Sequence, residues 1–294
     1  MLKNILITGA SGQLGNSVLK QLYGKYELLA TDINYKNNNT LNIPFTKLDI
    51  TDFDQIKNTL ANFNPTVIIN LAALTDVDGC ELNPDRTYLL NTKSIEMLTD
   101  NFDGQFIQIS SDYVFDGYNG PYSEDADTNP LSIYGKSKLE AEKILQDFVG
   151  NWCILRTNVL FDYYHGTEAS FIKWVFDSLK SNSSIEVVND QWNNPTWTQS
   201  LAEVIELVVD KNVIGLYNYG GADYLNRFEF AQIIANIFNL DKTLISPINT
   251  DSLNQVAPRP LKGGLKTEKI EKDFDIKCVE LKYSLSMIKS GLTK

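Results

Sequence analysis

The stretch Asn4-Ile-Leu-Ile-Thr8, followed by Gly9-Ala-Ser-Gly12-Gln-Leu-Gly15, decides the fold of this chain. A short apolar run of this kind is typical of a buried parallel strand. The three glycines come directly after it and open a segment that predicts a helix to about residue 23. Such a loop turns tightly and lets a pyrophosphate approach the backbone, because side chains are absent there. We therefore expect a dinucleotide site at this loop.

Strands and helices alternate beyond the loop. Five further segments predict strands, at residues 27–32, 45–49, 67–72, 106–110 and 152–156. The segments between them predict helices, among them 85–101 and 132–148. This alternation indicates an α/β fold with a doubly wound parallel sheet of the Rossmann type and right-handed crossovers.

Composition excludes several classes of protein. The 294 residues are 43% apolar and 21% charged, which is ordinary for a globular chain. The net charge of -11 disfavours a nucleic-acid partner, because phosphate backbones recruit basic surface. No apolar run is long enough for a membrane span, and no signal peptide precedes the first strand, so we expect a cytoplasmic protein. His165 is the only histidine and no Gly-x-Ser-x-Gly motif accompanies it, which disfavours a Ser-His-Asp hydrolase.

Tyr134-Gly-Lys-Ser-Lys138 carries the chemistry that the sequence predicts. Four-residue spacing places Tyr134 and Lys138 on one face of the expected helix. Tyrosine is a weak acid, with an ordinary pKa of about 10. A neighbouring ammonium favours the phenolate, so we expect Lys138 to lower the pKa of Tyr134. A proton-transfer pair beside a dinucleotide site indicates a hydride-transfer enzyme.

Asp32 bears on which dinucleotide is bound. It ends the second expected strand, and an acid there binds a ribose 2'-hydroxyl and repels a 2'-phosphate. No basic residue follows it directly and the glycine loop carries none, so NADH is favoured over NADPH. Lys36 lies near enough in sequence to keep both cofactors open.

Further motifs follow the same order along the chain: Asn70-Leu-Ala-Ala73, Ser110-Ser-Asp-Tyr-Val-Phe-Asp-Gly117, Leu155-Arg-Thr157 and Pro258-Arg-Pro260. With the glycine loop and the Tyr134–Lys138 pair, they resemble the extended short-chain dehydrogenase/reductase superfamily. The closer resemblance is to the dTDP-4-dehydrorhamnose reductase family, over nearly the whole chain. The glycine loop and the Tyr-Lys pair are typical of the whole superfamily. The Ser-Asp-Tyr block and the late Pro-Arg-Pro narrow the resemblance to the reductase family.

The resemblance implies a set of site residues. Ser111, Tyr134 and Lys138 would form the catalytic triad. Tyr134 and Lys138 would also contact the cofactor, together with Gly9, Ser11, Gly12, Gln13, Leu14, Gly15, Asp32, Asp49, Ile50, Leu71, Ala72, Ala73 and Asn91. The substrate would meet Thr75, Val77, Asp112, Tyr113, Asn158, Trp192 and Arg259. Ser17 stands where some members have a metal-binding glutamate, so no metal site is expected.

The resemblance also implies the architecture. Residues 1–157 would form the dinucleotide-binding domain, and 187–213 would return to it. Residues 158–186 and 214–294 would form a smaller C-terminal α/β substrate-binding domain. Substrate would lie between them, at the carboxyl ends of the strands. We expect a homodimer, the commonest symmetric assembly.

The implied reaction is reduction of the 4-keto group of a nucleotide-linked 6-deoxyhexose, with dTDP-4-dehydro-L-rhamnose giving dTDP-L-rhamnose. Dehydratases of the superfamily carry a glutamate where this chain has Tyr113, which favours simple carbonyl reduction. The sequence departs from the family pattern at two places, so the identity of the sugar and of the nucleotide stays open. The segment Asp190-Gln-Trp-Asn-Asn-Pro-Thr196 has an asparagine where the family has glycine, and Lys262-Gly263 stands after the Pro-Arg-Pro motif where Asn-Ser is usual. The alternatives are another nucleotide-sugar reductase or epimerase, or a non-catalytic NAD(P)-binding regulatory subunit, since relatives of this fold serve methionine adenosyltransferase.

Overall fold

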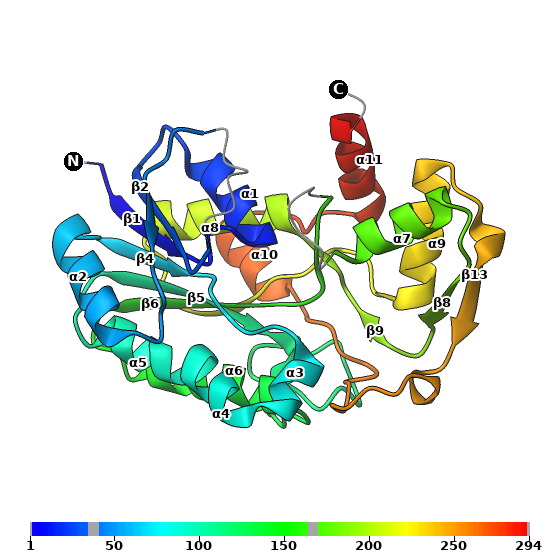
Figure 1. The fold of residues 1–294 in the computed structure, drawn as a ribbon, viewed down its shortest axis with the longest axis horizontal. Coiled ribbons are helices and arrows are strands. Elements are labelled where there is room, and N and C mark those ends of the chain that lie inside the picture. The colour runs from blue at the N-terminus through cyan, green and yellow to red at the C-terminus, as the bar shows by residue number, and fades with distance from the viewer. Residues whose placement is uncertain (1, 35–40, 164–169, 293–294) are drawn as a thin grey trace.

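A computed structural model describes residues 2–34, 41–163 and 170–292. The chain forms a large lobe around a parallel sheet and a smaller lobe beside it (Figure 1). Seven strands make the sheet, in the order β11-β6-β5-β4-β1-β2-β3. Their bounds are β1 Asn4–Thr8, β2 Glu27–Asp32, β3 Phe45–Lys47, β4 Val67–Asn70, β5 Gln105–Ser111, β6 Asn151–Thr157 and β11 Gly215–Asn218. The predicted doubly wound parallel sheet is confirmed, because every pair in it is parallel.

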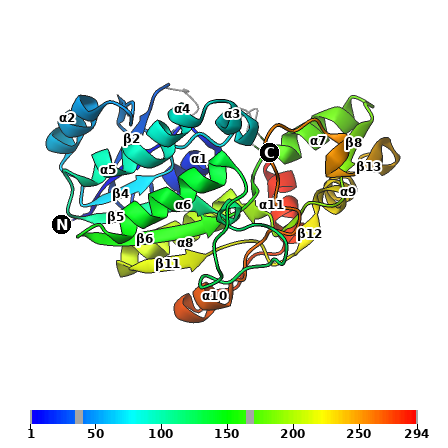
Figure 2. The same ribbon diagram turned by 90° about the horizontal axis from the view of Figure 1, so that it is seen from below.

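Helices cover both faces of the sheet, above and below it in Figure 1. One face carries α1 (Gln13–Leu22), α8 (Thr198–Lys211) and α10 (Glu268–Phe274), whose apolar residues share a core with the strands. The other carries α2 (Phe53–Phe63), α5 (Ser94–Thr99) and α6 (Ile133–Gln146), which bury a second core. Figure 2 shows these layers from a second direction. The predicted helix over 85–101 is made of α4 (Pro84–Tyr88), a π-helical turn η1 (Leu89–Lys93) and α5.

The smaller lobe has a core of its own. Helices α7 (Phe171–Lys180), α9 (Arg227–Phe238) and α11 (Leu281–Leu292) pack around a parallel pair of strands, β8 (Ile185–Val188) and β13 (Ile245–Ile248). Shorter elements complete the chain: α3 (Val77–Leu82), the 3-10 turns η2 (Asp112–Val114), η3 (Lys242–Leu244) and η4 (Thr250–Ser252), and the pairs β7 (Leu160–Phe161) with β10 (Thr196–Trp197) and β9 (Trp192–Asn193) with β12 (Leu225–Asn226). Within the described ranges, no helix has both the length and the apolar composition to cross a membrane.

The expected boundaries differ from the structure at two places. Strand β11 is the seventh strand of the large sheet, and Ile270 and Phe274 of α10 pack into the core of that sheet. Both segments fall in 214–294, which we had assigned to the smaller domain. Conversely, β8 pairs with β13 in the smaller lobe, so the chain returns to the large lobe only after β8 and not from residue 187. Parallel strands need a long crossover connection between them. Because β11 pairs parallel to β6, the chain between them includes the helix α8. The assignment of a function to each domain stays a prediction.

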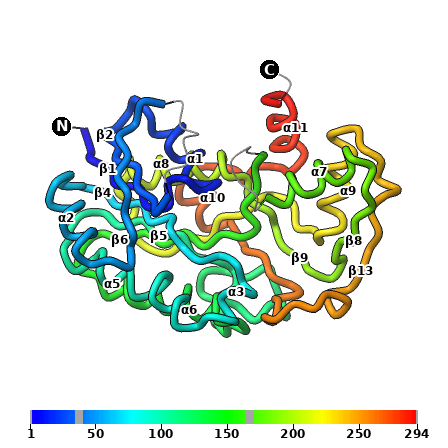
Figure 3. The backbone as a smooth tube through the Cα atoms, viewed as in Figure 1, coloured from blue at the N-terminus to red at the C-terminus, as the bar shows by residue number. Residues whose placement is uncertain are grey.

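A strap of residues 257–266 ties the two lobes together. Its Lys262 N–H donates to the carbonyl of Gly117 in the large lobe at 2.7 Å. Its Leu261 carbonyl accepts from the N–H of Trp192, at the start of β9, also at 2.7 Å. Figure 3 shows this orange segment running from β13 past α3 to α10. The strap therefore closes one side of the space between the lobes.

Candidate active site

The glycine loop joins β1 to α1 with no room for side chains. Gly9 has a φ of 63°, and a Cβ there would lie 2.7 Å from the backbone nitrogen of Ala72. A Cβ on Gly15 would lie 2.5 Å from the carbonyl oxygen of Ala10. Gly12 caps α1 without a side-chain hydrogen bond, so the first N–H groups of the helix are left for another acceptor. An exposed helix start of this kind fits a pyrophosphate.

Asp32 lies beside this loop, at the end of β2. Its carboxylate accepts the N–H of Ser11 at 3.0 Å, and the hydroxyl of Ser11 donates to the carbonyl of Asn34 at 2.9 Å. The side chain is only half-buried, which leaves oxygen lone pairs for a ribose hydroxyl. Lys36 and His165 lie outside the described residues.

The remaining cofactor candidates follow β3 and β4. Ile50 is buried, and Asp49 accepts the hydroxyl of Thr51 at 2.7 Å as the chain turns into α2. Leu71, Ala72 and Ala73 form a half-buried segment after β4. Asn91, in the π-helical turn, is buried and both donates to and accepts from the backbone of Leu74, at 3.0 and 2.7 Å. Asn91 thus fixes the segment that would face the cofactor.

Tyr134 lies in the first turn of α6, which begins where the Ser132 hydroxyl accepts the N–H of Gly135. Its ring meets the ring of Tyr113 edge-on, with centroids 5.4 Å apart. Burial raises the pKa of Tyr134, a hydrogen bond from Ser111 opposes this, and Tyr113 adds to the rise. The expectation that Lys138 lowers this pKa is wrong, because the cost of burying a phenolate dominates. The phenol is therefore held in its protonated form.

Lys138 is one helical turn further along and is buried. Burial lowers the pKa of its ammonium to about 8, and the Glu142 carboxylate opposes that change. Among the residues that the structure describes, none accepts a hydrogen bond from this ammonium. A buried cation without an acceptor is unfavourable, so the position fits a group that brings hydroxyls to it, as a ribose does.

Asp112 has a different environment from the one we expected. Only 4% of it is exposed, and its carboxylate accepts from the N–H of Gly264 at 3.1 Å and from the hydroxyl of Ser111 at 3.2 Å. Burial raises its pKa to about 6. The carboxylate thus joins Ser111 to the strap.

The other substrate candidates come from both lobes. Thr75 is exposed just before α3, and Val77 is its half-buried first residue. Trp192 stacks on Tyr224, with ring centroids 5.8 Å apart. Asn158 is buried and donates to Asn194 at 2.7 Å, while its own amide oxygen has no partner in the described part of the chain.

Arg259, on the strap, is already paired. Its guanidinium lies 3.0 Å from the carboxylate of Asp78 and donates to the carbonyl of Ala257 at 3.0 Å. The charge that we had expected to meet the substrate is therefore balanced by an acid of α3. Its remaining N–H groups are what it can offer to a substrate.

Sequence analysis missed Arg227, the first residue of α9. Its guanidinium lies over the ring of Phe171, 5.4 Å from the centroid, and interacts electrostatically with Asp112, Tyr113 and Arg259. The available signal was weak: α9 carries no acid three or four positions after this arginine to pair with it.

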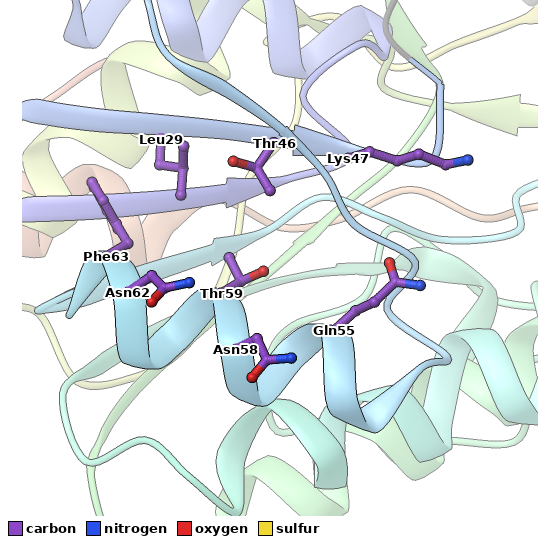
Figure 4. Close-up of a pocket in the computed structure, with 8 residues that line it drawn as sticks. All are labelled: Leu29, Thr46, Lys47, Gln55, Asn58, Thr59, Asn62 and Phe63. Atoms are coloured by element: carbon purple, nitrogen blue, oxygen red, sulfur yellow. The ribbon is translucent and has the colours of Figure 1, made fainter.

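A separate hollow of about 380 Å³ lies at the far edge of the sheet, between β2, β3 and α2 (Figure 4). Lys47 and the amides of Gln55, Asn58 and Asn62 line it. None of the predicted site residues lines this hollow, so it plays no part in the site.

Together, the parallel sheet, the glycine loop and the Ser111–Tyr134–Lys138 group at the carboxyl ends of the strands define an extended short-chain dehydrogenase/reductase. The family model described as "RmlD substrate binding domain" matches residues 3–292, so the chain belongs to this family. This match confirms the family that the motifs predicted.

Individual relatives agree with this. The chain is 32% identical to dTDP-4-dehydrorhamnose reductase of Aggregatibacter actinomycetemcomitans, over 97% of this chain and 98% of the relative. It is 33% identical to methionine adenosyltransferase 2 subunit beta of Bos taurus, over 92% and 82%. The crystal structure of dTDP-4-dehydrorhamnose reductase from Bacillus anthracis in complex with NADP superposes with a TM-score of 0.90, at 26% identity, over 99% of this chain and 100% of that one.

Proposed function

We propose that this chain reduces the 4-keto group of a nucleotide-linked 6-deoxyhexose, with dTDP-4-dehydro-L-rhamnose as substrate and dTDP-L-rhamnose as product. The protein is an NAD(P)H-dependent oxidoreductase, as its family membership implies. The observation that carries the proposal is the phenol of Tyr134 in contact with Ser111 and edge-on to Tyr113, one helical turn before the buried Lys138.

The chemistry follows from these side chains. A nicotinamide cofactor held at Gly9 to Gly15, Asp32 and Lys138 would supply the hydride for C4 of the sugar. The Ser111 hydroxyl would turn its one proton from the Asp112 carboxylate to the carbonyl oxygen and stabilise the negative charge that develops there. Tyr134 donates its proton to the same oxygen, and the resulting phenolate regains a proton from solvent. The raised pKa of Tyr134 suits this direction, because an acid that stays protonated at neutral pH is ready to donate.

The remaining residues have supporting roles. Lys138 would hold the nicotinamide ribose, Gly9 to Gly15 the pyrophosphate, and Asp32 the adenosine ribose. Asp49, Ile50, Leu71, Ala72 and Ala73 would line the adenine and nicotinamide sides, with Asn91 behind them. Tyr113, Thr75, Val77, Trp192, Asn158 and Arg259 would surround the sugar and its diphosphate, and Asp112 would hold Ser111 in place. We propose NADH as the preferred cofactor, because the Asp32 carboxylate would repel a 2'-phosphate.

The test is oxidation of NADH and NADPH with dTDP-4-dehydro-L-rhamnose, followed by identification of the sugar product. We expect turnover to dTDP-L-rhamnose, faster at equal concentration with NADH. Absence of turnover, with cofactor binding shown by fluorescence, would refute the reductase proposal for this sugar. Faster turnover with NADPH would refute only the role given to Asp32.

Tyr134→Phe tests the proton donor. We expect kcat to fall by at least about 100-fold, the usual scale for loss of a general acid, while cofactor affinity stays unchanged. Tyr118→Phe is the matched control, because Tyr118 is 64% exposed on a neighbouring loop. Equal kcat values for the two variants would remove Tyr134 from the mechanism.

A second candidate is a non-catalytic NAD(P)-binding regulatory subunit. The 33% identity to methionine adenosyltransferase 2 subunit beta favours it. The triad weighs against it, since a regulator needs no proton donor. A wild-type chain that binds NADH, turns over no 4-keto nucleotide sugar and alters the activity of an adenosyltransferase would support this candidate. Assembly as a homodimer and a cytoplasmic location stay predictions.

A further inference from the structure

The first turn of α6 is held on both sides of Tyr134. The hydroxyl of Ser132, which caps the helix, accepts the N–H of Gly135 at 3.2 Å. The carboxylate of Glu81 accepts the N–H of Ile133 at 2.9 Å. The first N–H groups of a helix have no partner within the helix, so each of these contacts satisfies a donor that α6 leaves open. The donor to Glu81 belongs to the residue directly before the proton donor of the proposed reaction.

Glu81 comes from a distant part of the chain. It lies in α3, is half-buried, and precedes its partner Ile133 by 52 residues. A local cap such as Ser132 moves with its helix, because it belongs to the same turn. A carboxylate on another element fixes the start of the helix relative to that element. Glu81 therefore determines where the first turn of α6 lies in the fold.

The helix α3 is itself anchored beside Glu81. Cys80 is fully buried, and its carbonyl accepts the hydroxyl of Thr87, in α4, at 3.3 Å. The thiol of Cys80 donates to the carbonyl of Leu74 at 3.6 Å. Because the residue next to Glu81 is fixed in this way, the carboxylate is a stationary point against which α6 is placed.

The same short helix also holds the strap. The carboxylate of Asp78, in α3, accepts the N–H of Ala257 at 2.9 Å. The strap in turn donates the N–H of Gly264 to Asp112, which also accepts the hydroxyl of Ser111. One helix is therefore connected to both groups that would meet the carbonyl oxygen, to the tyrosine through α6 and to the serine through the strap.

From these contacts we infer that Glu81 is a positioning residue, which holds the Tyr134 phenol where it meets Ser111 and the carbonyl oxygen. The inference rests on the proposed function, because the phenol is the proton donor only in that reaction. Glu81 acts through the helix, since its carboxylate bonds to the backbone before Tyr134. A misplacement of about 1 Å can lower a rate by about 100-fold, so a smaller shift of the first turn has a measurable effect on kcat.

Three single variants separate this role from a general loss of stability. Glu81→Met removes the acceptor, whereas Glu81→Gln keeps an amide oxygen in its place. Glu271→Met is the matched control, because Glu271, in α10 on the other face of the sheet, also accepts a backbone N–H at 2.9 Å, that of Cys278. We expect Glu81→Met to lower kcat by about 10-fold with KM and NADH affinity within about twofold of the wild type. Glu81→Gln and Glu271→Met should keep kcat within about twofold.

A double variant shows whether Glu81 acts through Tyr134. Tyr134→Phe removes the phenolic proton, so adding Glu81→Met to it should lower kcat no further. Two independent roles would instead multiply the two losses. Multiplied losses would overturn the inference, and so would a wild-type kcat for Glu81→Met.

Hydrogen exchange gives a readout that requires no substrate. Mass spectrometry of peptides that cover the first turn of α6 should show faster amide exchange in Glu81→Met than in the wild type, with Glu81→Gln and Glu271→Met unchanged. Unchanged exchange in Glu81→Met would overturn the inference. Faster exchange in Glu81→Met, in a chain whose wild type turns over no dTDP-4-dehydro-L-rhamnose, would support Glu81 as the anchor of α6 and refute the proposed reduction instead.

Discussion

Arg156 and Arg227 are two buried arginines treated in opposite ways by the two lobes. Arg156, in β6, forms a bidentate pair with Glu142 of α6, with nitrogen–oxygen distances of 2.9 and 2.7 Å, and both side chains are at most 4% exposed. Arg227, at the start of α9, lies over the ring of Phe171 and interacts with the Asp112 carboxylate electrostatically, without a hydrogen bond to it. The first arginine is held by two hydrogen bonds to one acid, whereas the second keeps its N–H donors free of any acceptor in the described part of the chain.

Lys138 belongs with Arg227 in this comparison, although it lies in the large lobe. It is four residues from Glu142 on the same helix, yet the carboxylate bonds to Arg156 and Ser110. Arg156 therefore takes the hydrogen bonds of the Glu142 carboxylate that Lys138 would otherwise use. This leaves the ammonium facing the cofactor side of the site.

The largest effect should separate the two arginines by stability. Arg156→Met leaves the Glu142 carboxylate buried without its counter-charge, so we expect the free energy of unfolding to fall by about 3–5 kcal/mol. Arg227→Met loses a cation–π contact and an electrostatic attraction to Asp112 without a hydrogen bond, and should cost less, at most about 2 kcal/mol. Urea unfolding of both variants without nucleotide measures the difference. Equal losses would show that Arg227 is structural and that the comparison fails.

The pH dependence of NADH binding tests whether the ammonium of Lys138 contacts the cofactor. Its pKa of about 8 is lower than in the unfolded chain, so the folded protein releases this proton more readily. The ammonium thus costs stability at neutral pH, and that cost disappears as the pH rises from about 8 to about 10.4. If the ammonium holds the ribose, NADH affinity is constant below pH 8 and falls by up to about tenfold per pH unit above it.

Fluorescence titration of NADH between acidic and alkaline pH checks this expectation. Lys138→Arg should bind with little dependence on pH, because a guanidinium stays charged throughout the range. An unchanged wild-type affinity on both sides of pH 8 would show that the lysine does not contact the cofactor as an ammonium.

The smallest effect belongs to Arg259, the arginine whose charge is balanced at the mouth of the cleft. Because the Asp78 carboxylate is about one-third exposed, the pair should contribute no more than about 1 kcal/mol. Arg259→Met should therefore raise KM for the dTDP-sugar by less than about fivefold. A larger increase would show that Arg259 contributes more to substrate binding than its pairing with Asp78 leaves available.

The large sheet was predictable because its signals are local. Most of the first six strands are short apolar runs next to a turn or helix, with β3 (Phe-Thr-Lys) as the exception. The glycine loop marks the point where β1 ends and α1 begins. Strand β11, with the sequence Gly-Leu-Tyr-Asn, carries too little apolar pattern to be recognised alone. Its place follows from the neighbour β6, a contact between distant segments that no local pattern encodes.

The site divides in the same way. Ser111, Tyr134 and Lys138 lie in motifs that the sequence displays, and the structure brings Ser111 and Tyr134 into contact. The remaining contacts join segments that are far apart in the chain: Arg259 with Asp78, and Asp112 with Gly264. The raised pKa of Tyr134 was missed for a related reason, since burial by the whole fold outweighs a charge one turn away.

The late arrival of β11 and α10 has a consequence for synthesis. A nascent chain that ends before residue 215 has no partner for the outer edge of β6, and the apolar residues of α10 that cover that region are not made until residue 274. The large lobe therefore emerges from the ribosome in an unfinished form, and the last segments to be translated complete both lobes. Chains that stall before α10 should be prominent chaperone clients and substrates for degradation.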